Sequence, residues 1–185
     1  MEPPPELAEA WRVYEALAAL AGLAAADRFY LAELLPRELA YLKARRAPDR
    51  RYAASLHTLG ESAEAVVIAA HLLGARQVVL LASPRTESNV PRVAGLLPGV
   101  RVAHRRVDPE DLDAVLAAAL EAARDLPRPL AVDMTGGTKV MAAAMALAAE
   151  RLQADLYYLA SQHKTRYRRP LPGSERLVLV RNITG

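Results

Sequence analysis

Residues 130–150 read LAVDMTGGTKVMAAAMALAAE, in which a short apolar run precedes two glycines between threonines, a lysine and an alanine-rich segment. The apolar run is typical of a buried strand, and alanine has the highest helix propensity of all residues. The stretch therefore predicts a strand that passes directly into a helix through a polar turn. Repeated units of this kind build parallel α/β sheets.

The same alternation of apolar runs and helical segments continues on both sides of this stretch. It predicts an α/β fold with a Rossmann-like, mostly parallel six-stranded sheet in the order 3-2-1-4-5-6. The last two strands lack a helix between them, so we expect an antiparallel edge there. We expect Asp108 and Pro109 to begin the helix before the fourth strand, as N-cap and first residue. The predicted strands are residues 52–57, 77–83, 100–107, 129–134, 155–161 and 176–183.

The first 50 residues have a different pattern. Apolar residues recur at helical spacing from residue 6 to about residue 46, and Pro36 is expected to kink or divide this helical segment. We therefore expect a helical extension over residues 1–50 and a Rossmann-like domain over residues 51–185. The basic run KARRAPDRR at 43–51 is interpreted as a solvated linker, with a DNA-binding helical pair or a protein-binding surface as the alternative.

Composition narrows the class of protein. The chain has 185 residues, 52% of them hydrophobic, a formal net charge of +3 and no cysteine. Without cysteine there are no disulfides or thiolate metal sites, and a cytoplasmic location is expected. The four histidines are scattered, so neither a metal nor another cofactor is expected. The start MEPPPE is unlike a signal peptide, and the charged residues within 13–35 argue against a membrane span.

The expected strand order makes the first and fourth strands neighbours. Ligands of open α/β sheets bind at the carboxyl ends of such a pair, which here carry HTLGES (57–62) and DMTGGT (133–138). Glycine allows close approach of the backbone, and the following helix N-termini attract a phosphate or carboxylate. Lys139 opposes the helix dipole, which favours an anionic ligand in front of it. The candidate ligand-binding residues of the two turns are Thr58, Gly60, Ser62, Thr135, Gly136, Gly137, Thr138 and Lys139.

Two familiar nucleotide sites are excluded by their spacing. The turn TGGTKV lacks the GxxxxGK[ST] spacing of the P-loop, and the first turn, TLGESA, lacks the dinucleotide fingerprint GxGxxG. The second strand ends in LLAS, without the acidic residue that would bind a ribose of NAD. A kinase, an ATPase or a dehydrogenase is therefore not expected.

The combination of motifs resembles the CARF domain, the CRISPR-associated Rossmann fold. TLGES after the first strand, the following SAEAVVIAAHLLGARQVVLLASPRTES and the later DMTGGTKVMAAAMALAA carry the resemblance, which covers about residues 51–185. The DxTGGTK element is fairly specific, whereas the first motif is weak by itself. In most members the CARF domain precedes an effector domain, so the helical extension at the N-terminus is a departure.

The resemblance implies binding of a cyclic oligoadenylate, most readily cyclic tetra-adenylate, across the two-fold interface of a homodimer. It also implies that both turns contact ribose or phosphate. Looser candidates for base contact, or for closure over the ring, are Ser83, Arg85 and Thr86 after the second strand and the basic loop Lys164–Arg169.

Three functions remain open: a sensor of the ring, a ring nuclease, and a regulator or partner- or membrane-coupled effector acting through the N-terminal helices. A metal-independent ring nuclease would let a ribose 2′-hydroxyl attack the adjacent phosphate and leave a 2′,3′-cyclic phosphate. Lys139 would stabilise the developing charge and Ser62 would position the reacting groups, so these two are the candidate catalytic residues. His57 is the only histidine near the first turn, but a lone histidine at a strand end is more often structural.

Overall fold

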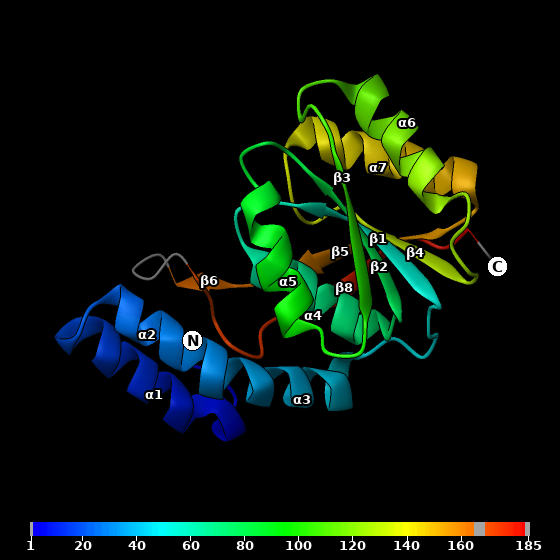
Figure 1. Ribbon diagram of the computed structural model, residues 1–185. Coiled ribbons are helices and arrows are strands. Elements are labelled where there is room, and N and C mark those ends of the chain that lie inside the picture. The colour runs from blue at the N-terminus through cyan, green and yellow to red at the C-terminus, as the bar shows by residue number, and fades with distance from the viewer. Residues whose placement is uncertain (1, 165–168, 184–185) are drawn as a thin grey trace. The chain divides into compact units, whose positions relative to one another are not determined.

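The computed structural model describes residues 2–164 and 169–183. The chain divides into two compact units (Figure 1). One unit contains residues 1–47 together with 160–176, and the other contains residues 48–159 together with 177–185. From the sequence we expected the loop at 160–176 to belong to the Rossmann-like domain, whereas in the structure it is grouped with the N-terminal helices. Each unit is described by itself.

The larger unit is built on a six-stranded sheet. Its strand order is β3-β2-β1-β4-β5-β8, which confirms the predicted order 3-2-1-4-5-6 once two short strands inside the last loop are set aside. β1 pairs with β2 and with β4, β2 pairs with β3, and β4 pairs with β5. These four pairings are parallel, as the strand–helix alternation predicted. The strands are β1 (Ala54–Leu59), β2 (Gln77–Ala82), β3 (Arg101–Arg106), β4 (Leu130–Asp133), β5 (Asp155–Ala160) and β8 (Arg176–Arg181).

Helices cover both faces of this sheet. In Figure 1, α6 (Leu112–Ala123) and α7 (Lys139–Leu152) lie on one face, and α4 (Ala63–Leu73) and α5 (Val90–Leu96) lie on the other. A short 3-10 turn, η2 (Glu87–Asn89), precedes α5.

The predicted start of α6 is wrong by three residues. Asp111 is the N-cap, with its carboxylate accepting from the Ala114 N–H at 2.9 Å. The Asp108 carboxylate instead accepts from the Glu110 N–H at 3.0 Å and closes a turn before the helix. Both aspartates can cap, and Asp111 is the one that leads directly into the apolar face of α6.

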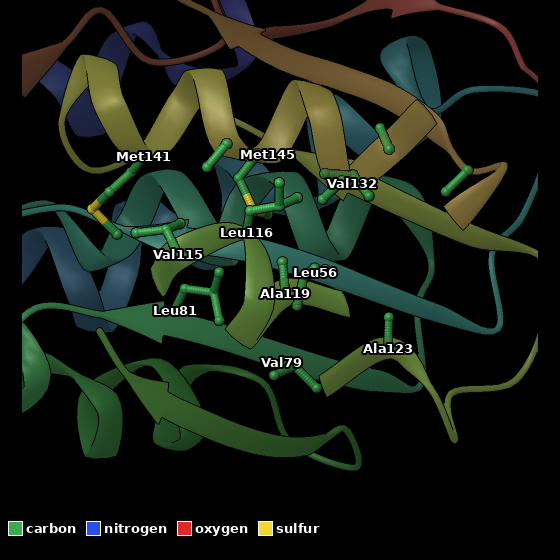
Figure 2. Packing of buried hydrophobic residues seen from close by; sticks show 14 of the residues in the cluster. Leu56, Val79, Leu81, Val115, Leu116, Ala119, Ala123, Val132, Met141 and Met145 are labelled. Carbon is green, nitrogen blue, oxygen red and sulfur yellow. The ribbon is translucent and has the colours of Figure 1, made fainter. Parts of the chain in front are cut away.

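The main core lies between the sheet and the helices α6 and α7 (Figure 2). Leu56, Leu81 and Val132 project from three neighbouring strands, and they meet Leu116 of α6 and Met145 of α7. Because side chains alternate along a strand, the residues between them face α4 and α5. This alternation places Ser55, His57 and Asp133 on the face opposite α7.

The smaller unit begins with helices that follow one another closely. They are α1 (Pro5–Leu20), α2 (Leu23–Phe29), the π-helical segment η1 (Tyr30–Leu34) and α3 (Leu35–Arg46). The chain breaks at Gly22, which has φ of 84°, rather than at Pro36. Pro36 lies in the first turn of α3, which follows η1 directly, so the helix remains continuous there. A proline has no N–H to donate, and the wider turn of η1 accommodates this missing bond.

The remainder of the smaller unit is the loop at 160–176. Two short antiparallel strands, β6 (His163–Lys164) and β7 (Arg169–Pro170), form a hairpin that the sequence pattern did not predict. The Arg169 guanidinium lies 3.8 Å from the centre of the Tyr30 ring and binds Asp27 at 2.8 Å. The buried Glu38 carboxylate accepts from the Gly173 N–H at 2.9 Å. These contacts join the loop to α2, η1 and α3.

In the part of the chain that the structure describes, no helix combines the length and apolarity needed to cross a bilayer.

Candidate ligand-binding site

The turns that follow β1 and β4 contact each other. β1 and β4 are parallel neighbours, with His57 opposite Asp133, so their carboxyl ends lie side by side. The Thr58 hydroxyl donates to the Gly136 carbonyl at 2.6 Å, across 78 residues of sequence. The predicted pairing of HTLGES with DMTGGT is therefore confirmed at the level of the backbone.

Glycine is required on both sides of this contact. A Cβ on Gly136 would lie 2.3 Å from the Thr58 carbonyl oxygen and 2.8 Å from the Gly60 nitrogen. A Cβ on Gly60 would lie 3.0 Å from the Gly137 nitrogen. Gly137 has φ of 77°, which side chains rarely adopt. The sequence interpretation assigned these glycines to a ligand, whereas the structure shows that they first let the two turns touch.

Three threonine hydroxyls proposed as ligand donors are already committed to the protein. Thr58 donates to Gly136, as above, and Thr138 donates to the Pro109 carbonyl at 2.7 Å while accepting from the Met141 N–H as the N-cap of α7. The Thr135 hydroxyl donates to the Asp133 carboxylate at 2.5 Å and accepts from the Leu159 N–H at 2.7 Å. A hydroxyl has a single proton to donate, so in this arrangement none of the three offers one to a phosphate.

Backbone N–H groups take over the role of donors. Within the described residues, the N–H groups of Gly136, Gly137, Thr138, Lys139 and Val140 donate no hydrogen bond. The last two belong to the first turn of α7, a helix of 14 residues whose N-terminus is the positive end of its dipole. Successive free N–H groups ahead of a helix form a concave receptor for an anion.

Lys139 adds a full positive charge to this receptor. Its side chain is exposed, and no carboxylate of the described residues pairs with it. A cation at a helix N-terminus is unfavourable in the absence of an anion. The DMTGGTK turn therefore suits a phosphate or a carboxylate.

The first turn contributes ion pairs. Ser62, the N-cap residue of α4, is exposed, and its hydroxyl donates to Glu64 at 3.1 Å. Glu64 also pairs with Arg92 of α5, and the exposed Glu61 pairs with the exposed Arg85. These two acidic side chains were missed by the sequence interpretation. Each is neutralised by an arginine, so they do not oppose an anion at the neighbouring turn.

The candidates after the second strand are arranged differently. Ser83 and Thr86 are buried and bond to each other, with the Ser83 N–H donating to the Thr86 hydroxyl at 3.0 Å and the two hydroxyl oxygens 3.1 Å apart. They shape the loop from within, and only Arg85 of this group presents its side chain to solvent. In the candidate loop Lys164–Arg169, residues 165–168 lie outside the described residues.

A buried polar chain supports the second turn. His57 Nδ1 lies 3.0 Å from Asp133 Oδ2, and His57 Nε2 lies 2.7 Å from the Ser55 hydroxyl. All three side chains are fully buried. The set has the residue types of a serine-hydrolase triad, but no substrate can reach Ser55, so a hydrolytic triad is excluded here. His57 is structural, as the sequence interpretation favoured, and it cannot act as a base on a ligand.

The sequence did contain a signal for this buried set of hydrogen-bonded side chains. Ser55 and His57 are two residues apart in strand β1, so they share one face of the sheet, whereas Thr58 lies on the other face. Two polar side chains on a face buried in the core must satisfy each other or a partner strand.

Within the described residues there is no group of three or more histidine, aspartate or glutamate side chains suited to a metal ion.

Known proteins are similar to this chain in sequence and in fold. No protein-family model matches it. The CRISPR system endoribonuclease Csm6 of Thermus thermophilus is 30% identical to it over 138 residues, which are 71% of this chain and 30% of that protein. The chain thus spans about a third of the length of the curated relative.

Two solved structures share the fold. Can2 from Sulfobacillus thermosulfidooxidans, solved in complex with cyclic tetra-adenylate, has a TM-score of 0.52 and 21% identity, covering 58% of this chain and 32% of that one. Protein VC1899 from Vibrio cholerae has a TM-score of 0.52 and 10% identity, covering 58% and 30% of the two chains. Identities at this level show a common fold.

Proposed function

We propose that this protein, a CARF-domain protein by sequence and fold, binds a cyclic oligoadenylate at the contacting turns after β1 and β4. The observation that carries the proposal is the row of N–H groups from Gly136 to Val140, which have no partner among the described residues and lie beside Lys139, equally unpaired there. This receptor suits phosphates, which a ring of adenylates presents in regular succession. Can2, which shares the fold, was solved with cyclic tetra-adenylate.

The ligand's symmetry suggests how two chains would share it. A cyclic tetra-adenylate has a two-fold axis, and an isologous dimer presents each of its surfaces twice around such an axis. Two copies of the DMTGGTK turn would then bind two opposite phosphates of one ring. The proposed state is therefore a homodimer with one ring across its interface.

The proposed reaction is slow cleavage of the ring without a metal. A ribose 2′-hydroxyl attacks the adjacent phosphorus, the bond to the 5′-oxygen breaks, and the 5′-oxygen takes up a proton from water while the 2′-proton is released to water. Lys139 stabilises the negative charge that develops on the phosphate. Ser62, whose hydroxyl donates to Glu64, holds the ribose by accepting from a ribose hydroxyl. Since His57 is buried, the described residues near the turns include no histidine that could serve as base. This favours a slow timer over a fast nuclease.

The proposed division of labour follows the chain. The proposed ligand-binding domain is the expected segment 51–185 without the loop at 160–176, which groups with the N-terminal helices. Residues 1–50 are a helical extension through which binding acts on a protein or DNA partner. A salt-dependent shift of DNA by the full chain would support a DNA partner, because phosphate contacts release counterions. Its absence at low salt would leave a protein partner as the proposal.

The test is a binding and cleavage assay with cyclic adenylates of three to six units in the presence of EDTA. We expect tight binding of one ring size at one ring per two chains, and linear product ending in 2′,3′-cyclic phosphate. Tight binding with an intact ring would support a sensor. Absence of binding to every ring size would overturn the proposed function.

A further inference from the structure

We propose that the buried chain Ser55–His57–Asp133–Thr135 is a positioning device that sets the DMTGGT turn in its anion-binding shape. The chain runs from β1 through the end of β4 to the amide of Leu159 in β5. Ser55 and His57 have no access to a ligand, so they act only through the turn. The inference rests on the proposed function for its ligand, although its effect on the turn can be measured without one.

If Asp133 is a carboxylate and His57 a neutral imidazole, the hydrogen bonds among Ser55, His57, Asp133 and Thr135 have one consistent set of directions. Asp133 only accepts, so His57 carries its proton on Nδ1 and donates to Oδ2. An imidazole with its single proton on Nδ1 accepts at Nε2, and the Ser55 hydroxyl then donates to it at 2.7 Å. Thr135 donates to Oδ1 at 2.5 Å, which leaves its oxygen to accept from the Leu159 N–H. Every polar side-chain atom of these four residues therefore has a hydrogen-bond partner.

The hydrogen bond from the Leu159 N–H to the Thr135 hydroxyl replaces a backbone hydrogen bond between β4 and β5. β4 and β5 are paired up to Asp133 and Tyr157, and the Met134 N–H still donates to the Tyr157 carbonyl at 3.1 Å. At the next step the Leu159 N–H meets the Thr135 side chain rather than a backbone carbonyl. The backbone of Gly136 is thereby free to leave the ladder, and its carbonyl accepts from Thr58 of β1.

A purely structural role would not need this set of residues. Burying a carboxylate and an imidazole in a sheet is costly unless every partner is in place, and an apolar strand would pack as well without them. The chain leads to one place, the carboxylate that holds both the N–H and the hydroxyl of Thr135 at the entrance of the turn. Fully satisfied buried networks of this kind fix one arrangement of the backbone.

The experiment uses the whole 185-residue protein. It combines backbone amide NMR of residues 136–139 with titration by cyclic tetra-adenylate. Thr135→Val keeps the shape and removes the hydroxyl, so it cuts the chain between Asp133 and Leu159. We expect the amide resonances of the turn to shift or broaden in the ligand-free protein, and affinity to fall about tenfold or more, as displaced positioning groups generally cause. Thr135→Ser, which keeps the hydroxyl, should restore both. Val79→Ala, a core truncation on β2, is the control for general destabilisation and should leave the turn resonances unchanged.

Asp133→Asn tests the chain from a second position. An asparagine can accept from Thr135 and donate to His57 Nδ1, provided that His57 moves its proton to Nε2 and donates to Ser55. We therefore expect the imidazole nitrogen resonances to report the exchanged tautomer, with affinity within about threefold of wild type because the hydrogen bonds are kept.

The outcomes separate this inference from the proposed function. A wild-type protein that binds no cyclic adenylate overturns the proposed function, while the ligand-free spectra of Thr135→Val and Thr135→Ser still decide the positioning role. A folded Thr135→Val with wild-type turn resonances and wild-type affinity overturns the inference. If Thr135→Val does not fold, the tautomer in Asp133→Asn decides: His57 unchanged at Nδ1 would show that the four residues do not act as one chain.

Discussion

The hydroxyl of Thr58 donates to the carbonyl of Gly136 at 2.6 Å, and this bond joins the turn after β1 to the turn after β4. Nothing larger than glycine fits at position 136, since a Cβ there would overlap the Thr58 carbonyl oxygen. The two turns are therefore one structural unit, and the proposed receptor depends on both.

Gly136→Ala should separate the two turns. A Cβ 2.3 Å from the Thr58 oxygen forces backbone shifts, which typically cost about 1–3 kcal/mol of stability. We expect a lower free energy of unfolding in urea and a loss of ligand affinity. Gly95→Ala is the matched control, because Gly95 is exposed in α5 with nothing within 4 Å of an added Cβ. Alanine in a helix should stabilise there by up to about 1 kcal/mol. Equal effects of the two substitutions would contradict the role of the contact.

Lys139→Gln should affect binding and stability in opposite directions. Affinity for the ring should fall, and the dependence of log affinity on log salt should become shallower by about one unit because one phosphate contact is lost. The ligand-free protein should become more stable by about 0.3–1 kcal/mol, since a cation leaves the positive end of the α7 dipole. Arg151→Gln, in the last turn of the same helix, is the control. It should leave affinity unchanged and lower stability slightly, and a loss of affinity there would count against a localised site.

Stability of the smaller unit should depend on the buried pair Glu38 and Glu175. Burial and the neighbouring Glu38 charge raise the pKa of Glu175 from 4.5 to about 9, and burial also raises the pKa of Glu38. A carboxyl whose pKa is higher in the folded state holds its proton more tightly there. Its stabilising contribution is therefore complete below pH 4.5 and is lost as the pH rises toward 9.

The check on this pair is a series of melting temperatures between pH 5 and pH 9.5. We expect the wild-type transition of the smaller unit to fall by several degrees over this range, and Glu175→Gln to fall by much less. Glu33→Gln, an exposed partner of Arg37, should retain the wild-type slope. A slope in Glu175→Gln as steep as that of wild type would disprove the assignment.

Tyr52→Phe should destabilise the larger unit. The Tyr52 hydroxyl donates to the buried Asp155 carboxylate at 2.6 Å and lies 2.9 Å from the Tyr157 hydroxyl. Burial raises the pKa of Tyr52, so this hydroxyl stays protonated and remains a donor. Its removal leaves Asp155 short of one donor, which we expect to cost about 1–2 kcal/mol in urea unfolding. Tyr158→Phe is the control, because Tyr158 is 43% exposed on the same strand as Tyr157. An unchanged free energy of unfolding in Tyr52→Phe would show that the Arg50 guanidinium and the Ile183 N–H satisfy the Asp155 carboxylate without the Tyr52 hydroxyl.

Much of the sheet could be predicted because its signals are local. The run QVVLLA is apolar after its first residue and became the buried strand β2, and TGGTK led into α7 as expected. The start of α6 was placed at Asp108 because two aspartates compete as N-caps within four residues, and propensity does not rank them. The hairpin β6/β7 was missed because two-residue strands carry no periodicity to detect.

The candidate site was predicted in position but only partly in chemistry. Lys139 and the glycines lie where the strand order placed them, whereas Thr58, Thr135 and Thr138 spend their hydroxyl protons on the protein itself. The partners of Thr58 and Thr138 are 78 and 29 residues away, which no local pattern reveals. Ser55 and His57 could have been noticed from their period-two spacing, but their partner Asp133 is identified only by the register of β1 and β4.

The sequence by itself determined the α/β class, the strand order and the two polar turns at the switch point, because these follow from hydrophobic period and strand–helix alternation. Tertiary structure alone decided which polar groups remain available to a ligand. Pairing β1 with β4 brought Thr58 onto Gly136 and His57 onto Asp133, and so used up side-chain donors. Among the described residues it left free the backbone N–H groups of Gly136 to Val140 and the charge of Lys139, since a helix N-terminus cannot satisfy its own first N–H groups.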